Sequence, residues 1–345
     1  MILALALWAS GLLAAPPAVP PAAAIPAPVP EPVRSRIRGG RFDPGDFGFL
    51  KGRFPGASAD EVRDWEAVDR YETACMAAAA DTVRTALARA GASASGIRPQ
   101  PFGDRLCGEV VHATSAASPF EQWGPFAQAL RQAQPLVRSF LLGIRLQEQA
   151  AADFPSPAPA DALRRRAVAD STLRAASDWG AGDASASAPP VDAATRAVIG
   201  ALLDVELVRR DSDNLAWLRA FVAEHGWPRI GAVGKAAAEA AWLLVQHADA
   251  DPAFQLRALR MMEPLAGRGE VERDKLALLW DRVHLKTEGV QRFGTQTRCE
   301  GARRVAAGRL EDPQGVDARR RRMGLSTFEA NLRRIDRLYG ACGSH

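Results

Sequence analysis

Long helical patterns separated by proline or glycine dominate this sequence of 345 residues. Apolar residues recur at the three- to four-residue spacing of amphipathic helices, whereas alternating strand patterns are nearly absent. We expect one short extended piece around 291–297. Helices are predicted at about 60–90, 119–133, 135–152, 160–177, 192–210, 212–224, 233–248, 252–267, 271–287 and 326–339. The sequence therefore predicts an all-α fold: an irregular helical domain with an N-terminal helical extension and few or no strands.

Composition divides the chain into four parts. Residues 1–24 resemble a signal peptide, and residues 25–57 form a Pro/Gly-rich linker. An N-terminal helical region follows over 58–153. The proline-rich stretch "FPSPAPA" at 154–160 is the expected domain boundary, and a second helical domain covers 160–340.

The N-terminus predicts export. "MILALALWASGLLAA" is an apolar block of about fifteen residues, shorter than the ~20 residues of a membrane-spanning helix. Ala22, Ala23 and Ala24 offer a small-residue cleavage site, although the usual positive residue before the block is missing. We expect a periplasmic or secreted protein. Membrane association is expected only if the segment stays uncleaved.

The four cysteines agree with export. Cys75 and Cys107 lie in the N-terminal half, and Cys299 and Cys342 lie near the end. No C-x-x-C pair is present, which argues against zinc or thioredoxin-like chemistry. In an oxidising compartment, local pairing gives Cys75–Cys107 and Cys299–Cys342, while the sequence alone permits three connectivities.

The charge pattern excludes nucleic acid as the expected partner. The chain has 40 Arg against four Lys, and its net charge of +4 is small for its length. Residues 298–345 are locally basic, with eleven Arg and six acidic residues. The densest run is "DARRRRMGL" at 317–325, which we interpret as a solvated helix start. A site for anionic envelope polymers, built from Arg319 to Arg322, is the less favoured interpretation.

Five ordered segments resemble a known family. They are "VADSTLR", "DSDNLAWLRAFVAEHGWP", "VGKAAAEAAWLLVQHADADPAFQ", "LLWDRVHLKTEGVQRFGTQ" and "EDPQGVDARRRRMGL". From about residue 160 to 340 the chain is similar to the bacterial family called domain of unknown function 6624. The resemblance implies a shared fold and no agreed activity, so the residues themselves must indicate the function.

Polar residues follow two apolar helical stripes in these segments. Gln246 and His247 come directly after the stripe that contains Trp242 and Val245, and Asp281 and Arg282 lie beside a second stripe. The loop "GTQ" adds Thr295 and Gln296. Because buried polar groups need partners, we expect one polar cluster. Its members are His247, Asp281, Arg282 and Gln296, together with Gln246, Gln291 and Thr295.

This cluster has two interpretations. In the functional one, His247 is a general acid or base, Asp281 orients it, and Arg282 with the amide and hydroxyl side chains binds a small polar or anionic ligand, with hydrolysis as a candidate reaction. In the structural one, the same groups only fix the packing of a non-catalytic interaction module of the cell envelope. Across both interpretations, the expected partner is an unknown small molecule or an envelope component.

Other site chemistries find no support. His247, Asp249 and Asp251 are spaced like metal ligands, but side chains at this spacing diverge on a helix. Asp251 before Pro252 is instead the expected N-cap of the next helix, and Gly226 is an expected left-handed helix end. H-E-x-x-H, Walker and G-x-S-x-G motifs are missing from the sequence. We expect no metal and no cofactor.

Overall fold

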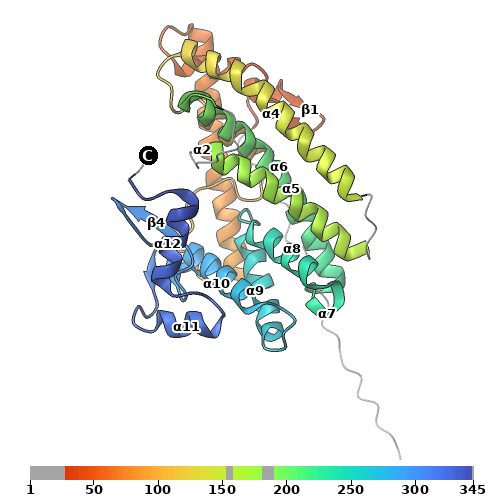
Figure 1. The fold of residues 1–345 in the computed structure, drawn as a ribbon. Coiled ribbons are helices and arrows are strands. Elements are labelled where there is room, and N and C mark those ends of the chain that lie inside the picture. Colours follow the sequence, from red (N-terminus) through yellow and green to blue (C-terminus); the bar gives the residue numbers. More distant parts are fainter. Residues whose placement is uncertain (1–27, 153–157, 181–189, 344–345) are drawn as a thin grey trace, which may run out of the picture.

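The computed structural model describes residues 28–152, 158–180 and 190–343, so the predicted signal segment at 1–24 lies outside the described residues. The fold is mostly α, as predicted (Figure 1). The helices are α1 (Glu31–Arg34), the 3-10 helix η1 (Gly48–Arg53), α2 (Ala59–Arg89), α3 (Arg105–Ser115), α4 (Trp123–Ala152), α5 (Ala158–Gly180), α6 (Ala193–His225), α7 (Ile230–Val233), α8 (Lys235–Gln246), α9 (Pro252–Ala266), α10 (Arg273–Glu288), α11 (Val316–Arg322) and α12 (Phe328–Tyr339).

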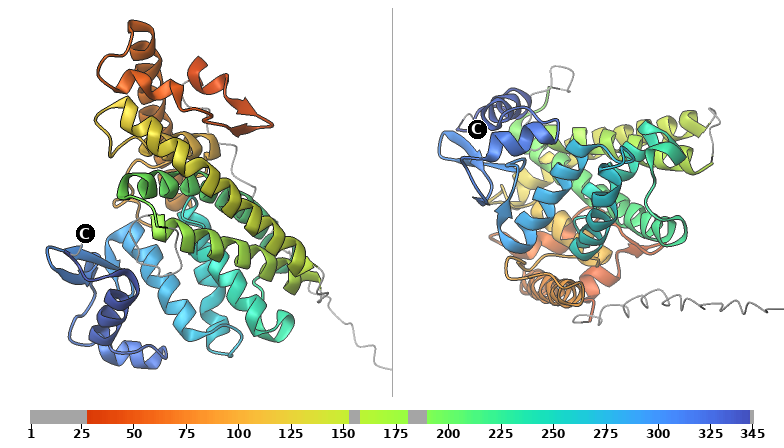
Figure 2. Two further views of the ribbon diagram at one scale, coloured as in Figure 1. Left: turned by 45° about the horizontal axis from the view of Figure 1, so that its top comes forward. Right: turned by 90° about the horizontal axis from the view of Figure 1, so that it is seen from below.

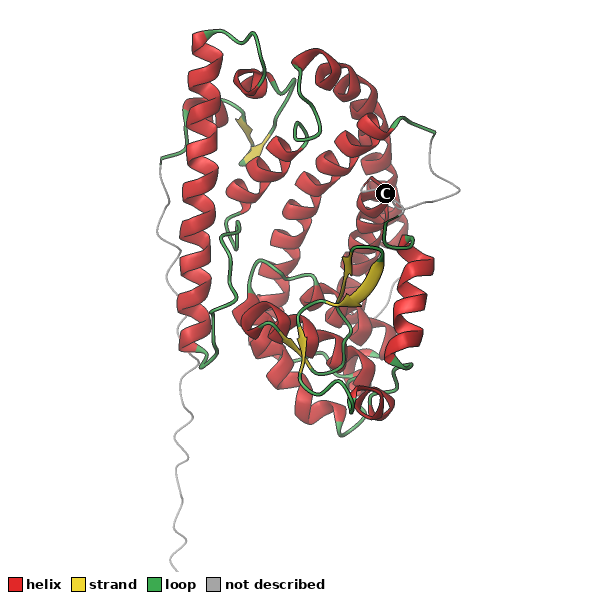
Figure 3. Ribbon diagram, turned by 90° about the vertical axis from the view of Figure 1, so that its left-hand side faces the viewer, coloured by secondary structure: helices red, strands yellow, loops and turns green. Residues whose placement is uncertain are grey.

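Strands are short and peripheral, as Figure 3 shows. They are β1 (Ile37–Arg38), β2 (Arg41–Phe42), β3 (Val290–Gln291), β4 (Thr297–Glu300), β5 (Arg303–Ala306) and β6 (Arg309–Leu310). The pairs β1–β2 and β4–β5 are antiparallel, and β3 pairs with β6 in parallel, with Val290 opposite Arg309. The extended piece expected around 291–297 is therefore the start of a small C-terminal strand region.

Three local predictions need correction. Pro135 lies inside α4 instead of starting a new helix. The missing N–H of a proline removes one backbone bond, but Ala133 and Val137 on either side stay buried, so one apolar stripe continues past it. Similarly, α6 runs unbroken through residues 210–212 because Leu207 and Leu215 keep its stripe buried. Cys107, expected in a loop, lies in the first turn of α3, which Asp104 caps through the Cys107 N–H.

The predicted linker at 25–57 is folded over its described residues. Six of its apolar side chains are buried core: Val33, Phe42, Phe47, Phe49, Leu50 and Phe54. The phenylalanine rings contact one another and the rings of Trp123 and Phe126 on α4. The glycines and prolines around them make the tight turns of the β1–β2 hairpin and η1, and aromatic burial holds these turns in place.

Two apolar clusters form the core, and neither respects the expected boundary at 154–160. One cluster joins residues of η1, α3 and α4 to Leu173 of α5 and Leu203 of α6. The other joins the C-terminal half of α2 to α8, α9 and α10, and includes Leu163 and Leu218. α2, α5 and α6 contribute to both clusters. The N-terminal helices therefore pack on the helices of the second region.

α5 and α6 lie side by side through the middle of the molecule (Figure 1 and Figure 2). They run antiparallel, because Arg166 bonds Asn214 while Ser177 bonds Asp204. Gly180 at the end of α5 packs against Gly200 of α6, and a Cβ added to Gly180 would lie 2.4 Å from the Gly200 Cα. Glycine at both positions allows this close approach, which sets how α5 and α6 pack at this end.

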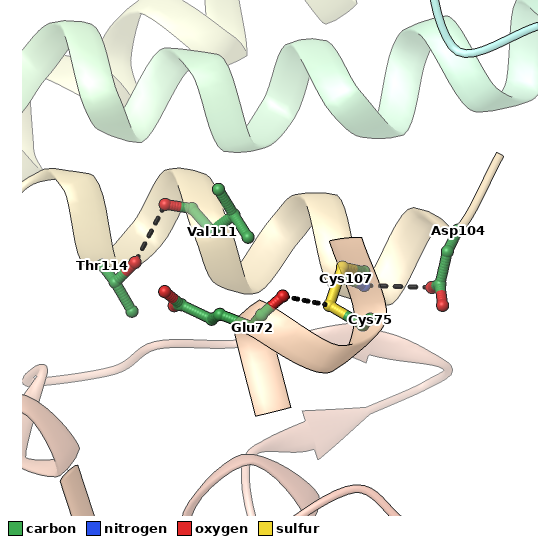
Figure 4. Close-up of a disulfide and its surroundings, with 6 residues drawn as sticks. All are labelled: Glu72, Cys75, Asp104, Cys107, Val111 and Thr114. Carbon is green, nitrogen blue, oxygen red and sulfur yellow. Dashed lines mark hydrogen bonds between the residues drawn. A yellow bond between two sulfur atoms is a disulfide. The ribbon is translucent and has the colours of Figure 1, made fainter. Parts of the chain in front are cut away.

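Both disulfides pair locally. Cys75 of α2 bonds Cys107 of α3 across a Cα–Cα distance of 5.9 Å (Figure 4). Cys299 of β4 bonds Cys342 across a Cα–Cα distance of 5.5 Å. Two disulfides indicate an oxidising environment. Across the described residues, every helix is too short or too polar to cross a membrane.

Candidate functional site

His247 ends α8 and contacts a carboxylate of α5. Its Nδ1 lies 2.6 Å from Oδ2 of Asp170, a residue that is fully buried, whereas the His247 side chain remains 17 % exposed. Asp170 and Arg174 share one face of α5 at a spacing of four residues. Arg174 Nε lies 2.9 Å from the same Nδ1 and 3.3 Å from Asp170 Oδ1.

These distances favour one proton assignment. Nδ1 of His247 cannot donate to Asp170 and also accept from Arg174, and the contact with Asp170 is the shorter one. We therefore assign the proton to Nδ1, so that Nδ1–H donates to Asp170 and the Arg174 Nε–H donates to the other carboxylate oxygen. Nε2 of His247 then carries a lone pair, and it has no hydrogen-bond partner among the described residues.

The charge states of the neighbours follow from their surroundings. Burial lowers the pKa of His247 against the opposing effect of Asp170, so the imidazole is neutral at pH 7. Asp211 of α6 accepts a 2.5 Å bond from Arg174 Nη2. Burial raises the pKa of Asp211 to about 7, with Arg174 opposing and the charges of Asp170 and Asp249 adding to the rise. The site thus holds a neutral imidazole and a carboxyl that is half protonated near neutral pH, and both groups contact Arg174.

Asp249 organises the second half of the cluster. It receives two bonds from Arg282, from Nε at 2.9 Å and from Nη2 at 2.5 Å, and a third from Lys286 Nζ at 2.8 Å. The Gln255 amide adds a fourth at 3.1 Å. Although burial alone would raise the pKa of Asp249, Arg282 and Lys286 hold it well below its usual range. Asp249 is therefore ionised at neutral pH.

The two halves form one partly exposed cluster. The charge of Arg282 acts on His247, and the charge of Asp249 acts on Arg174. Gln296 closes one side, with its Oε1 3.4 Å from Arg282 Nη1. We call this set the His247 cluster: Asp170, Arg174, Asp211, His247, Asp249, Arg282, Lys286 and Gln296. Its exposed side chains are between 17 and 44 % accessible, so solvent reaches it.

Asp281 does not lie beside His247. Its side chain is fully buried, and its carboxylate accepts the backbone N–H groups of Arg292, Phe293 and Thr295 at 2.7, 3.0 and 2.8 Å. The residue that contacts the imidazole is Asp170, so the expected orienting role of Asp281 is corrected. Asp281 instead holds the turn after β3.

Gln291, Thr295 and Gln246 are likewise occupied or buried within the protein. Gln291 Nε2 donates to the carbonyls of Gln296 and Ala307, and its Oε1 accepts from the Gln296 N–H. Thr295 is 8 % exposed and bonds the Gln296 amide, and Gln246 is 6 % exposed. Of the sequence-predicted site residues, the structure brings together His247, Arg282 and Gln296.

The arginine run is partly structural. Arg320 is 1 % exposed and donates to the carbonyls of Phe293 and Ser326. Arg319 donates to the Arg292 carbonyl and to Asp312. Two of the four guanidinium groups are thus bound to the protein itself, which favours the interpretation of this run as a folding element over a polyanion site.

Sequence reasoning missed four members of the cluster. Asp170 and Arg174 were visible as a carboxylate and a guanidinium four residues apart in "VADSTLR", and Asp211 begins "DSDNLAW". Lys286 is one of only four lysines in a chain that otherwise uses arginine. Asp249 had been considered only as a metal ligand. Within the part of the chain that the structure describes, no group of three or more His, Cys, Asp or Glu residues could hold a metal ion.

A family comparison matches this half of the chain. Residues 191–342 match the model of DUF6624, a family of unknown function, which confirms the resemblance. The match includes Asp211, His247, Asp249 and Arg282. α5, which carries Asp170 and Arg174, precedes the matched residues. Comparison with the curated proteins and with the solved structures finds no match to this chain.

Proposed function

We propose that this protein is a periplasmic or secreted enzyme that hydrolyses a small polar or anionic substrate by acid–base chemistry at His247. The observation that carries the proposal is the 2.6 Å contact between His247 Nδ1 and Asp170. The other imidazole nitrogen of His247, Nε2, has no hydrogen-bond partner among the described residues. A carboxylate bound to one imidazole nitrogen fixes the tautomer and leaves the other as a base.

The neighbours supply the remaining roles. His247 Nε2 takes a proton from a water molecule, and Asp170 stabilises the imidazolium that forms. Asp211, with its pKa of about 7, is the proton donor to the leaving group. Arg282 uses two of its nitrogens on Asp249, but its Nη1 has only the 3.4 Å contact with Gln296 and is available to a substrate oxygen.

A non-catalytic envelope module is the second candidate. One observation favours it: Arg174, Arg282 and Lys286 each already have a carboxylate partner. In that case the cluster only fixes the packing of α5, α6, α8 and α10, and His247 has no substrate. The two candidates differ in what His247 contributes beyond stability.

A paired histidine substitution separates the two candidates. The mature chain is assayed with p-nitrophenyl acetate, p-nitrophenyl phosphate and bis(p-nitrophenyl) phosphate as ester, phosphomonoester and phosphodiester probes. For the probe that is turned over, we expect His247→Gln to lower kcat/KM by about 100-fold or more. His225→Gln, at an exposed histidine outside the cluster, should leave it unchanged.

Two results would reject the enzyme. One is equal turnover by His247→Gln and the parent chain. The other is no turnover of any probe combined with a lower melting temperature for His247→Gln, which favours the packing role.

The compartment is tested separately, by fractionating cells that express the full chain and measuring the mass of the exported form, which should lack about 24 residues.

A further inference from the structure

A cavity away from the His247 cluster lies between α4, α5 and α6, with β2 at its edge. Its volume is about 230 Å³. Leu141 and Ile144 of α4 and Leu173 of α5 form its apolar wall. The cavity shares no lining residue with the His247 cluster, although Leu173 and Arg210 directly neighbour Arg174 and Asp211 along the chain. Ligand-sized cavities with an apolar wall and a few charged groups are typical of binding sites.

The carboxylates that line the cavity are already paired. Glu148 accepts a 2.5 Å bond from Arg210, and Glu206 accepts a 3.2 Å bond from Arg209. Asp213 lies 3.8 Å from the guanidinium of Arg105. Each of these carboxylates therefore has an arginine partner, and Arg105 and Arg209 are shared with the buried Glu109.

Two lining cations remain without such a partner. Arg41 of β2 and Arg145 of α4 also line the cavity, and neither forms an ion pair within the described residues. They approach the cavity from different elements. Both residues are exposed to solvent, and guanidinium groups without an ion-pair partner at the edge of a cavity favour an anion there.

Apolar surface continues outside the cavity next to Arg145. Leu142 and Leu146 of α4 are 50 and 56 % exposed, which makes them two of the most exposed large apolar side chains of the described protein. They flank Arg145 along the helix. The lining thus combines an apolar wall with three arginines and three carboxylates, and Arg41 and Arg145 are the lining arginines that have no ion-pair partner among the described residues.

We propose that this cavity binds a small amphipathic anion, with its charged group at Arg41 and Arg145 and its apolar part against Leu141, Ile144 and Leu173. The site is distinct from the His247 cluster and goes beyond the proposed hydrolysis. Its occupant needs a carboxylate, sulfonate or similar head on a compact apolar body, and a fully polar anion would leave the leucine wall without contact.

The experiment uses 8-anilinonaphthalene-1-sulfonate as a fluorescent probe and the folded full chain. We expect saturable binding of one probe molecule per chain, displaced by octanoate and not by octylammonium, which has the same apolar chain and the opposite charge. The double variant Arg41→Gln/Arg145→Gln should weaken probe binding by at least tenfold. Arg131→Gln is the matched control, because it changes an exposed arginine of α4 about 21 Å along the helix from Arg145.

A second variant keeps the test independent of the arginines. Leu141→Trp fills the cavity and should also weaken binding of the probe by at least tenfold. The far-ultraviolet circular dichroism spectrum of every variant should match that of the parent chain. The proposal is overturned by equal affinity in the parent chain and in either test variant, by equal displacement with octylammonium, or by an absence of saturable binding.

Discussion

Glu72 gives the sharpest stability prediction. It lies on α2 near Thr114 of α3, beside the Cys75–Cys107 disulfide (Figure 4). Its Oε1 is buried without a hydrogen-bond partner in the described part of the protein. Burial raises the pKa of Glu72 from 4.5 to about 7, with the Thr114 hydroxyl opposing the rise and Asp69 adding to it.

The direction of the pH effect follows from this rise. A carboxyl whose pKa is higher in the folded state contributes stability that is fully present below the unfolded pKa, near 4.5, and is lost as the pH rises through about 7. A difference of about 2.5 pH units between the two pKa values corresponds to about 3 kcal/mol of unfolding free energy. This is an upper limit, since water entering the site lowers the cost of the charge.

Glu72→Gln removes the charge and keeps the shape. We expect it to change the unfolding free energy little at pH 4 and to raise it by about 2–3 kcal/mol at pH 8. The measurement is urea unfolding followed by circular dichroism, with the disulfides intact, at both pH values. Glu66→Gln, at a 57 % exposed position of the same helix, is the control and should show no such difference. An equal effect of Glu72→Gln at pH 4 and pH 8 would refute the reasoning.

Two further predictions concern the C-terminal region. Asp281→Asn should lower the unfolding free energy by about 1–3 kcal/mol, because the amide NH₂ cannot accept a hydrogen bond and faces at least one backbone N–H that now donates to the carboxylate. Urea unfolding measures this loss, and the NMR titration of the His247 ring should be unchanged. Replacing both Cys299 and Cys342 by Ser opens a loop of 43 residues and should cost up to about 4 kcal/mol in the chain-entropy model. Unfolding curves that coincide with those of the parent chain would contradict it.

Features set by neighbouring residues were predictable from the sequence. The Asp251 side chain accepts the Phe254 N–H and caps α9, as expected from its place before Pro252. Gly226 ends α6 with a positive φ of 72°, as expected, but its ψ of −170° gives it an extended conformation and not the expected left-handed helical one. The local pairing of the cysteines was also preferred correctly, because short loops between cysteines close more readily than long ones.

Features set by distant contacts were not predictable. The carboxylate bound to His247 lies 77 residues earlier in the chain, and only the alignment of α5 against α6 and α8 brings it there. Asp281 seemed the better candidate because it precedes Arg282, which does reach the cluster. On a helix, however, adjacent residues point about 100° apart, so Arg282 faces Asp249 while Asp281 faces the turn after β3.

The contact between Gly180 and Gly200 affects the geometry of the His247 cluster, although neither glycine is a member of it. The glycine pair sets how closely α5 approaches α6, and the salt bridge from Arg174 to Asp211 joins the same two helices. A methyl group at Gly180 would meet the Gly200 backbone and push the helices apart at that end, which we expect to move Arg174 relative to Asp211. A larger residue at Gly180 is therefore expected to disturb the candidate centre from outside the His247 cluster.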